Sequence, residues 1–333
     1  MQGNLYIKYI YSWLLNIKNK MIKSYVIIMY FLRQFASINN RNKLIVQRLG
    51  VSPKSNDLNV EQLEWFQQWL VGFTDGDGSF TVSKSNKKWK LVFKISQNKY
   101  NLRILNYIKS NLKVGNITQE KKTNMANFKI TKLEHIGSII IPIFNKYPLL
   151  TSKQFNYERF KKSYFIMTNN NLSSLEKNSK LNELKLLKVK SSYISPIFEK
   201  SLFDFRNIEN IKNIPNMLTK PWLVGFIEAE GSFYITKKGY EMGFGITQKL
   251  DPHILYCIKY FLFLKCKIRK KEKHNYYILD TIIKNDILNI IDYLQNTMKG
   301  MKAFEFKIWS KCINKSNVEK LEIQFILRKL KNN

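Results

Sequence analysis

Hydrophobic positions along the chain change their period several times, and each change marks the boundary of a predicted element. Residues 69–77 repeat apolar side chains at helical spacing, whereas residues 80–83 alternate apolar and polar side chains, as a half-buried strand does. A turn signal at 85–87 separates this strand from a second alternating run at 89–95. Residues 101–112 then have the pattern of an amphipathic helix. The pattern therefore predicts a helix, a two-stranded hairpin and a further helix in succession.

The same order of elements occurs a second time, because the sequence contains an internal repeat. Residues 69–80 read WLVGFTDGDGSF and residues 222–233 read WLVGFIEAEGSF, so that their second acids, Asp77 and Glu230, lie 153 residues apart. Similar stretches follow both motifs at separations between 149 and 153 residues. Nearly constant separations over such a length indicate two copies of one domain.

Each copy reads as helix, strand, strand, helix, two weaker strands and helix. We therefore predict an α+β protein of two pseudo-symmetric αββαββα domains, with antiparallel, saddle-shaped sheets packed through the two motif helices. The stretch between the copies is rich in Asn, Ser and then Lys, and it is predicted as a linker with one short helix around Leu181–Val189. The predicted divisions are a basic leader (1–58), the first domain (59–166), the linker (167–216) and the second domain (217–333).

Small residues lie four apart on one face of each motif helix. They are Gly72 with Gly76 in the first motif and Gly225 with Ala229 in the second. Glycine inside a helix costs about 1 kcal/mol, which is explained if two helices approach each other backbone to backbone. We therefore predict that the motif helices pack side by side about a pseudo-two-fold axis.

Such packing would bring the last acids of the two motifs, Asp77 and Glu230, close together. Two carboxylates at the negative ends of two helix dipoles repel each other, and a cation that prefers hard oxygen ligands, such as Mg²⁺, would compensate them. Carboxylates that hold a metal beside a phosphate suit phosphodiester hydrolysis. The alternative is a helix seam whose acids merely face solvent. The matching registers of the two copies, each followed by a lysine-bearing ribbon, favour the metal site.

The charge of the chain restricts the class of partner. Fifty-six Lys and Arg against 24 Asp and Glu give a net charge of +32 and a predicted pI near 9.9. Such a field attracts a polyanion, which is DNA, RNA or an anionic membrane. No apolar run of about 18 residues occurs, so a membrane span is not expected. Cysteines and histidines are scattered, so neither a zinc site of ordinary spacing nor a disulfide framework is expected.

The first 56 residues contain no acid and nine Lys or Arg. A basic, acid-free leader is typical of a mitochondrial transit peptide. The leader is also poor in Ala and rich in Asn, Ile, Lys and Tyr, as an A+T-rich genome would encode, and this bias runs through the whole chain. We favour a leader that is encoded and translated within the organelle. Both interpretations place the protein in the mitochondrion.

The two motifs resemble the signature of the double-motif LAGLIDADG homing endonucleases, and the likeness covers roughly residues 60–165 and 217–315. It is close to the fungal mitochondrial group I intron endonucleases, some of which are also RNA maturases. The resemblance implies that the last acid of each motif binds metal and carries catalysis. It also implies that a strand-end Gln and a later Lys line the site, and that the lysines position or activate water or neutralise charge on the phosphorane. The first acids, Asp75 and Glu228, are expected to be structural or interface residues. The predicted catalytic residues are Asp77, Glu230, Lys153, Lys302, Gln97 and Gln248, and the predicted metal site comprises Asp77, Glu230, Gly76 and Ala229.

The outward positions of the predicted ribbons are polar or basic, and a two-stranded ribbon fits the major groove of DNA. In the second copy, Gly243 and Gly245 thin out this face. The predicted DNA-binding residues are Thr81, Ser83, Ser85, Lys88, Lys90 and Lys94 in the first copy, and Tyr234, Thr236 and Lys238 in the second.

We therefore expect a magnesium-dependent endonuclease that cuts both strands of one long, asymmetric DNA site and so promotes intron homing. It is expected to act as a monomer with internal pseudo-two-fold symmetry, and no membrane partner is expected. The alternative is an RNA maturase that assists splicing of its own group I intron, with that intron RNA as its partner. A DNA-binding regulator on the same scaffold would have no use for the paired acids.

Overall fold

The computed structural model describes residues 55–198, 218–238 and 240–332. The second of the two compact units of the chain, Leu63–Asn333, contains both predicted domains except residues 59–62 of the first. The predicted leader, residues 1–58, lies outside the described residues except at its C-terminal end. Within the described ranges, no helix is long and apolar enough to cross a membrane.

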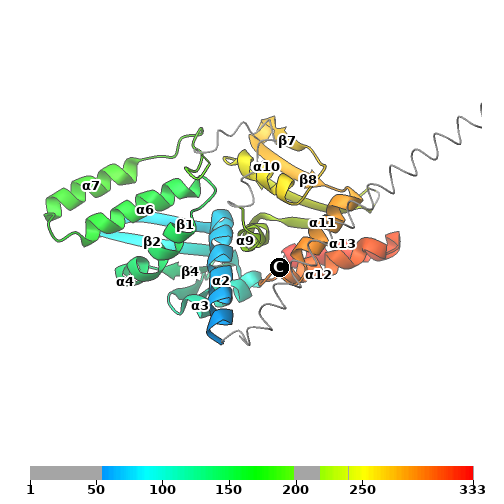
Figure 1. The fold of residues 1–333 in the computed structure, drawn as a ribbon, viewed down its shortest axis with the longest axis horizontal. Coiled ribbons are helices and arrows are strands. Elements are labelled where there is room, and N and C mark those ends of the chain that lie inside the picture. The colour runs from blue at the N-terminus through cyan, green and yellow to red at the C-terminus, as the bar shows by residue number, and fades with distance from the viewer. Residues whose placement is uncertain (1–54, 199–217, 239, 333) are drawn as a thin grey trace, which may run out of the picture. The chain divides into compact units, whose positions relative to one another are not determined.

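The first half contains a four-stranded antiparallel sheet, whose strands pair in the order β1-β2-β4-β3 (Figure 1). A motif helix precedes the sheet, and a helix follows each hairpin, as the predicted αββαββα order requires. The elements are α2 (Ser55–Asp77), β1 (Gly78–Ser85), β2 (Lys88–Asn98), η1 (Lys99–Asn101), α3 (Leu102–Leu112), β3 (Asn116–Gln119), β4 (Met125–Ile130), α4 (Leu133–His135), η2 (Ile136–Ile140), α5 (Ile141–Lys146) and α6 (Lys153–Thr168).

The core of the first half surrounds Phe80 of β1. Its ring packs against Phe93 of β2, Phe144 of α5, and Tyr157 and Phe160 of α6, and all five side chains are buried. Side chains alternate across a strand, so burying this face of β1 and β2 leaves the opposite face to the intervening polar residues. The alternation read from the sequence is therefore confirmed.

The second half repeats this topology, with strands in the order β5-β6-β8-β7. Phe233 of β5 occupies the place of Phe80 and packs against Phe244, Phe306 and Trp309. Helices beyond the predicted seven-element order are α6 in the first half, and α12 and α13 in the second. The elements are α9 (Lys220–Glu230), β5 (Ser232–Ile235), β6 (Met242–Gln248), α10 (Pro252–Phe261), β7 (Ile268–Lys271), η5 (Glu272–His274), β8 (Tyr276–Thr281), α11 (Lys284–Leu294), α12 (Lys302–Ser310), η6 (Lys311–Asn314) and α13 (Asn317–Asn332).

The predicted short helix of the linker exists, but it begins earlier than Leu181–Val189. It is α7 (Ser174–Leu186), which packs against α6 (Figure 1). A reciprocal capping box between Ser173 and Glu176 sets its start, because it satisfies backbone donors at the first turn. The helix therefore begins seven residues before the predicted start, Leu181.

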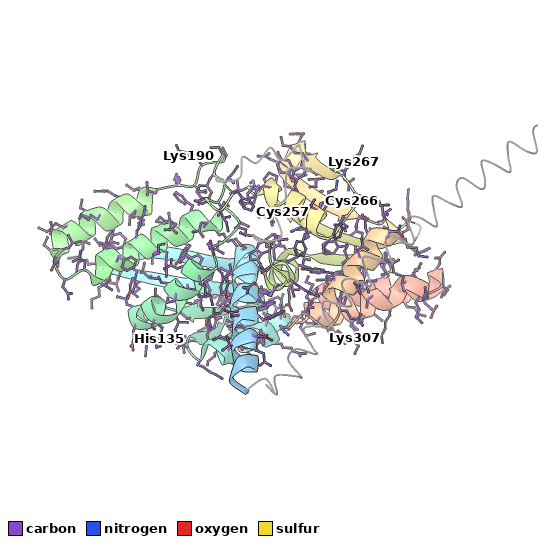
Figure 2. The ribbon with its side chains drawn as sticks, viewed as in Figure 1. His135, Lys190, Cys257, Cys266, Lys267 and Lys307 are labelled. Atoms are coloured by element: carbon purple, nitrogen blue, oxygen red, sulfur yellow. The ribbon has the colours of Figure 1, made fainter. Side chains whose placement is uncertain are left out.

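The three cysteines, Cys257, Cys266 and Cys312, are free and buried. Cys257 and Cys266 both belong to the second half, on α10 and just before β7 (Figure 2). Burial raises the pKa of Cys257 to about 12, so its thiol is protonated at neutral pH.

Candidate active site

The two motif helices, α2 and α9, meet with their backbones in contact, as the small residues predict. A Cβ atom added to Gly72 would lie 1.9 Å from the carbonyl oxygen of Trp222, and one added to Gly225 would lie 2.1 Å from that of Trp69. Farther along the seam, Gly76 faces Ala229, whose methyl group would be 2.3 Å from a Cβ on Gly76. Any larger side chain would force the helices apart.

The first acids of the motifs hold this seam together by a crossed pair of hydrogen bonds. Trp222 of α9 donates its indole N–H to Asp75 of α2 at 2.8 Å, and Trp69 of α2 donates to Glu228 of α9 at 3.0 Å. Both carboxylates are buried, and burial raises the pKa of each to about 6. Their predicted place at the helix interface is confirmed.

The same two acids also fasten the loops that lead into the lysine helices. Asp75 accepts the backbone N–H groups of Leu150 and Thr151 at 2.9 and 3.0 Å. Glu228 accepts those of Lys299, at 2.8 Å, and Gly300. Each loop immediately precedes the helix that begins at Lys153 or Lys302. The buried acids therefore fix where these two helices begin relative to the motif helices.

The second acids, Asp77 and Glu230, end the two motif helices beside each other. A Cβ atom on Gly76 would lie 3.1 Å from Cγ of Glu230, which places the two helix ends in contact. Burial raises the pKa of both carboxyls, and the negative charge of Asp77 raises that of Glu230 further. The predicted repulsion between the paired acids therefore exists in this fold.

The predicted Lys153 and Lys302 lie close to both acids. Their positive charges oppose the rise in the pKa values of Asp77 and Glu230. Nζ of Lys153 donates to the carbonyl oxygens of Thr74, at 3.2 Å, and Gly76. Nζ of Lys302 donates to the carbonyl oxygen of Gly231 at 2.9 Å. The lysines are thus held by backbone at the C-terminal ends of the motif helices, and burial lowers the pKa of Lys153.

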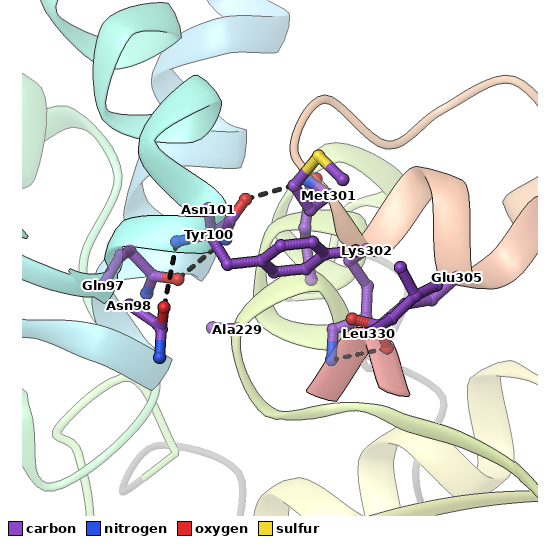
Figure 3. A pocket seen from close by; sticks show the side chains of 10 residues that line it. Gln97, Asn98, Tyr100, Asn101, Ala229, Met301, Lys302, Glu305 and Leu330 are labelled. Atoms are coloured by element: carbon purple, nitrogen blue, oxygen red, sulfur yellow. Dashed lines mark hydrogen bonds and ion pairs between the residues drawn. The ribbon is translucent and has the colours of Figure 1, made fainter. Parts of the chain in front are cut away.

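The two predicted glutamines behave differently. Gln97, at the end of β2, donates from Nε2 to Asp77 at 2.6 Å. Gln248 ends β6 at the matching position, but it forms no hydrogen bond with Glu230 in the described part of the chain. Gln97 is oriented by Asn101, which donates to its Oε1 at 2.8 Å (Figure 3). Among the described residues, the glutamine therefore contacts the motif acid in the first half of the site only.

Asn101 and Asp251 form two further contacts across the seam, which sequence reasoning missed. Oδ1 of Asn101, in the first half, accepts the N–H of Met301 at 2.8 Å, beside a small cavity (Figure 3). Asp251, in the second half, accepts the N–H of Ser152 at 2.7 Å and its hydroxyl at 2.9 Å. Each contact holds the residue before a site lysine. The signal was the repeat itself, because 101 and 251 are matching positions at a separation of 150.

The site suits a hard divalent cation in its chemistry. Asp77 and Glu230 supply carboxylate oxygens. Burial raises the pKa of both carboxyls, and the charge of Asp77 adds to the rise at Glu230, so a bound cation would stabilise their charged forms. Within the described ranges, no group of three or more His, Cys, Asp or Glu side chains could hold a metal, so solvent or ligand oxygens would complete any coordination shell. Of the other predicted metal positions, the carbonyl of Gly76 accepts a hydrogen bond from Lys153, and Ala229 packs in the seam.

The strand register places the predicted DNA-binding residues of the first half on one face of their sheet, opposite the face that packs on the helices. β4 extends this face with Lys129, which stands opposite Lys94. Sequence reasoning missed Lys129, because β4 was recognised only as a weak strand. The predicted residues that share the face are Thr81, Ser83, Ser85, Lys88, Lys90 and Lys94.

The corresponding face of the second sheet carries fewer charges near its hairpin. Tyr234 points outward from β5, while the hydroxyl of Thr236 donates to the carbonyl oxygen of Lys238 at 2.6 Å and so belongs to the turn. Lys238 is exposed in that turn. The basic residues of this face that were not predicted are Arg269 and Lys271 of β7, which share the outward side of their strand.

Comparison with known proteins agrees with this geometry. The family model of the LAGLIDADG endonucleases matches residues 70–164 and 223–313. A probable intron-encoded endonuclease of Schizosaccharomyces pombe, Cox1-I1b, is 42% identical over 282 residues, which cover 80% of this chain and 69% of that protein. A probable intron-encoded endonuclease of Kluyveromyces lactis, aI3, is 31% identical, over 74% of this chain and 65% of that protein.

Solved structures show the same fold. The crystal structure of the meganuclease I-SmaMI bound to uncleaveable DNA has a TM-score of 0.61 and 24% identity, and the match covers 80% of this chain and 97% of that one. The LAGLIDADG meganuclease I-AabMI bound to uncleaved DNA has a TM-score of 0.60 and 24% identity, over 80% of this chain and 98% of that one. The predicted α+β fold of two antiparallel four-stranded sheets is confirmed.

Proposed function

Because the chain belongs to the LAGLIDADG endonuclease family, we propose that it is a magnesium-dependent nuclease that cuts both strands of one long DNA site. One observation carries the proposal. Two acids and two lysines, drawn from both repeats, meet where the motif helices end, and no structural need explains two mutually repelling carboxylates there. The cut would open an intronless allele at the exon junction and so promote homing of the intron that encodes the protein.

The residues of the chain divide the chemical work. Asp77 and Glu230 would hold Mg²⁺, which when bound offsets negative charge on the phosphate and activates water. Lys153 and Lys302, fastened to backbone carbonyls, keep a positive charge beside the acids, where charge on the phosphorane develops. Burial lowers the pKa of Lys153, which brings its ammonium closer to exchanging a proton with water. Gln97 holds the carboxylate of Asp77 in one orientation.

The two sheets supply a DNA-reading surface in a single chain. In the first half, polar and basic side chains occupy the face turned away from the packing helices. The second half presents a different set on the matching face. Two related but unequal surfaces would read an asymmetric site, and a monomer with internal pseudo-two-fold symmetry is sufficient for this.

We place the protein in the mitochondrion. The acid-free leader supports this location, and so does the name of one relative. One relative is an uncharacterized mitochondrial protein of Saccharomyces cerevisiae, RF1, which is 32% identical over 68% of this chain and 44% of its own length.

Cleavage of the intronless exon–exon junction by the purified full-length protein tests the proposal. With Mg²⁺ the protein should cut both strands, and EDTA should stop it. Glu64→Gln is a matched control, because it also turns an acid of α2 into an amide, but at a solvent-exposed ion pair with Lys146. It should cut at the normal rate, whereas Asp77→Asn should not. Cleavage that persists undiminished in chelator would overturn the two-carboxylate mechanism.

A second candidate function, assistance in splicing the host intron, is favoured by a separate basic surface. Exposed lysines occur on α7 and the segment that follows it, and α7 packs on the helix α6, away from the outward face of the sheet. Folded RNA is recognised largely through its shape and its phosphates, which such a surface could contact. These lysines are Lys180, Lys185, Lys188 and Lys190.

An in vitro splicing assay of the host intron, run beside the cleavage assay, separates the two functions. If splicing assistance exists, Asp77→Asn should preserve it, and replacement of the four lysines by alanine should remove it without affecting cleavage. Loss of splicing assistance together with cleavage in every variant would mean that one surface serves both nucleic acids.

A further inference from the structure

A polar cluster crosses the outward face of the second sheet and joins the strands β5, β8 and β7. Tyr234 of β5 donates its phenolic O–H to Oδ1 of Asp280 on β8. Arg269 of β7 donates from Nη2 to Oδ2 of the same carboxylate at 2.9 Å. The two oxygens of Asp280 are therefore held by different partners, one from each side of its strand.

Two glycines of β6 make this cluster possible. Gly243 stands opposite Tyr234, and a Cβ atom at Gly243 would lie 2.2 Å from the tyrosine ring. Gly245 stands opposite Asp280, and a Cβ atom there would lie 3.1 Å from Oδ1 of the aspartate. The missing side chains leave room for the tyrosine ring to lie across β6 and reach β8. The face that looks thin in sequence is covered by this ring.

The cluster gives Arg269 a fixed orientation at the edge strand. An exposed ion pair contributes little by itself, because holding two flexible side chains costs entropy. Here the carboxylate of Asp280 is already held by Tyr234, and its side chain is only 27% exposed, so the arginine is held by a rigid partner. The guanidinium has five N–H donors in a planar fork. With its side chain 54% exposed, Arg269 presents the remaining donors to whatever lies on this face.

The acid beside it decides which kind of DNA group suits this arginine. A carboxylate repels phosphate, so a basic residue intended for the DNA backbone gains nothing from an adjacent acid. Guanine offers two uncharged acceptors, O6 and N7, in the major groove, and a planar arginine fork matches them in pairs. Lysines such as Lys90 and Lys94 of the first sheet are instead flexible point charges, which suit phosphates.

We infer that Arg269, oriented by Asp280 and Tyr234, determines specificity by reading a guanine in the half of the DNA site that the second sheet contacts. This inference rests on the proposed function, since it requires DNA on the outward faces of the sheets. It assigns the cluster to base recognition and the lysines of the first sheet mainly to affinity.

The test is a binding selection in EDTA, with full-length protein and a library of DNA duplexes randomised over about two helical turns. Wild type should select one site that includes an invariant G·C pair in one half. Arg269→Ala should reduce the preference for that pair about 10- to 100-fold and leave the other positions unchanged. Arg269→Lys should do the same, because it keeps the charge but loses the fork. Tyr234→Phe and Asp280→Asn should reduce the preference partially, since the arginine remains but is less well held.

Lys271→Ala is the matched control, because Lys271 lies on the same face of the same edge strand but outside the cluster. It should weaken binding to all sequences to the same extent. Selection of a distinct site whose G·C preference survives Arg269→Ala would overturn this inference and leave the proposed function intact. Equal weakening of all sequences by Arg269→Ala would show a phosphate contact and would also overturn it. If wild type selects no sequence at all, the proposed site-specific function itself fails.

Discussion

Trp222 of the second motif donates its indole N–H to Asp75 of the first motif at a distance of 2.8 Å, inside the seam between the two motif helices, although the two residues are 147 positions apart in sequence. The reverse pair, Trp69 with Glu228, repeats the bond across the pseudo-two-fold axis. Buried carboxylates are therefore used twice in this seam. One pair ties the helices and loops together, and the other pair, Asp77 and Glu230, supplies the candidate metal ligands.

The buried tie should make stability depend on pH. Asp75 has a pKa of about 6 in the folded protein against 3.8 ordinarily, so between these values the folded state binds more protons than the unfolded state. The free energy of unfolding therefore falls as pH rises from about 4 to about 6, by roughly 3 kcal/mol from this group. Denaturant unfolding at pH 4 and pH 7 should show this loss, and Asp75→Asn should remove its share.

Glu176→Gln gives the opposite sign as a control. The pKa of Glu176 is lowered by its hydrogen bonds with Ser173, so its carboxylate favours the folded state above its usual pKa. Compared with wild type, Glu176→Gln should therefore lose more unfolding free energy at pH 7 than at pH 4. An identical pH profile for wild type and Asp75→Asn would contradict the burial of a carboxyl at the seam.

Helix contact at the seam predicts a large effect of one methyl group. Gly72→Ala would place a Cβ atom 1.9 Å from the carbonyl oxygen of Trp222, so the helices must separate. We expect the free energy of unfolding to fall by roughly 3 kcal/mol or more. The cleavage rate should also fall, because the paired acids move apart. Asn106→Ala, on the exposed side of α3, should change the unfolding free energy by less than about 0.5 kcal/mol. Equal stability of the two variants would exclude close packing of α2 and α9.

The paired acids should trade stability against activity. Asp77→Asn removes the charge that raises the pKa of Glu230, so it should stabilise the metal-free protein at neutral pH, on the order of 2 °C in Tm. The same change should abolish double-strand cleavage and remove the increase in Tm that Mg²⁺ gives to wild type. Thermal melts in EDTA and in Mg²⁺ measure both effects. A lower Tm in EDTA would mean that the carboxylates do not repel each other.

Asn101 is expected to position two site residues at once. Its amide orients Gln97 toward Asp77, and its oxygen holds the residue before Lys302. Asn101→Ala should therefore lower the cleavage rate about tenfold or more, while DNA binding stays within about twofold. A merely structural role would lower Tm and leave the rate of the folded fraction unchanged. Single-turnover rates and melts of Asn101→Ala and the exposed Asn106→Ala distinguish these outcomes.

Salt dependence should report the phosphate contacts of the first sheet. If about eight phosphates are contacted, log affinity should fall with log salt at a slope near −7. Replacing both Lys90 and Lys94 with Ala should make this slope shallower by about 2 and weaken binding similarly for all sequences. Titrations at several salt concentrations measure both. A slope near zero for wild type would show that the charge of the chain serves another partner.

Hydrophobic periodicity and the internal repeat were enough to predict the fold and the ends of the motif helices. Helix and strand periods can be recognised from residues that are close in sequence. Because the sequence contains a repeat, each element predicted in one copy was also predicted in the other. Asp77 and Glu230 were placed together from small residues four apart, because only close helices explain glycine there. The start of α7 was predicted too late, at Leu181, although the capping box of Ser173 and Glu176 that marks it is a local pattern.

The side-chain partners across the seam and across the sheets could not be predicted in this way. Trp222 binds Asp75, which is 147 residues away, and Asn101 binds Met301, which is 200 residues away. Asp280 binds Tyr234, which is 46 residues away on a strand that is not adjacent to its own. A hydrogen bond of this kind depends on the height of one helix against another and on the side chains that are absent nearby. Gly243 shows this most clearly, because its role is to leave space for the ring of Tyr234. Local periodicity carries no information about such spaces, since they arise only when distant segments pack together.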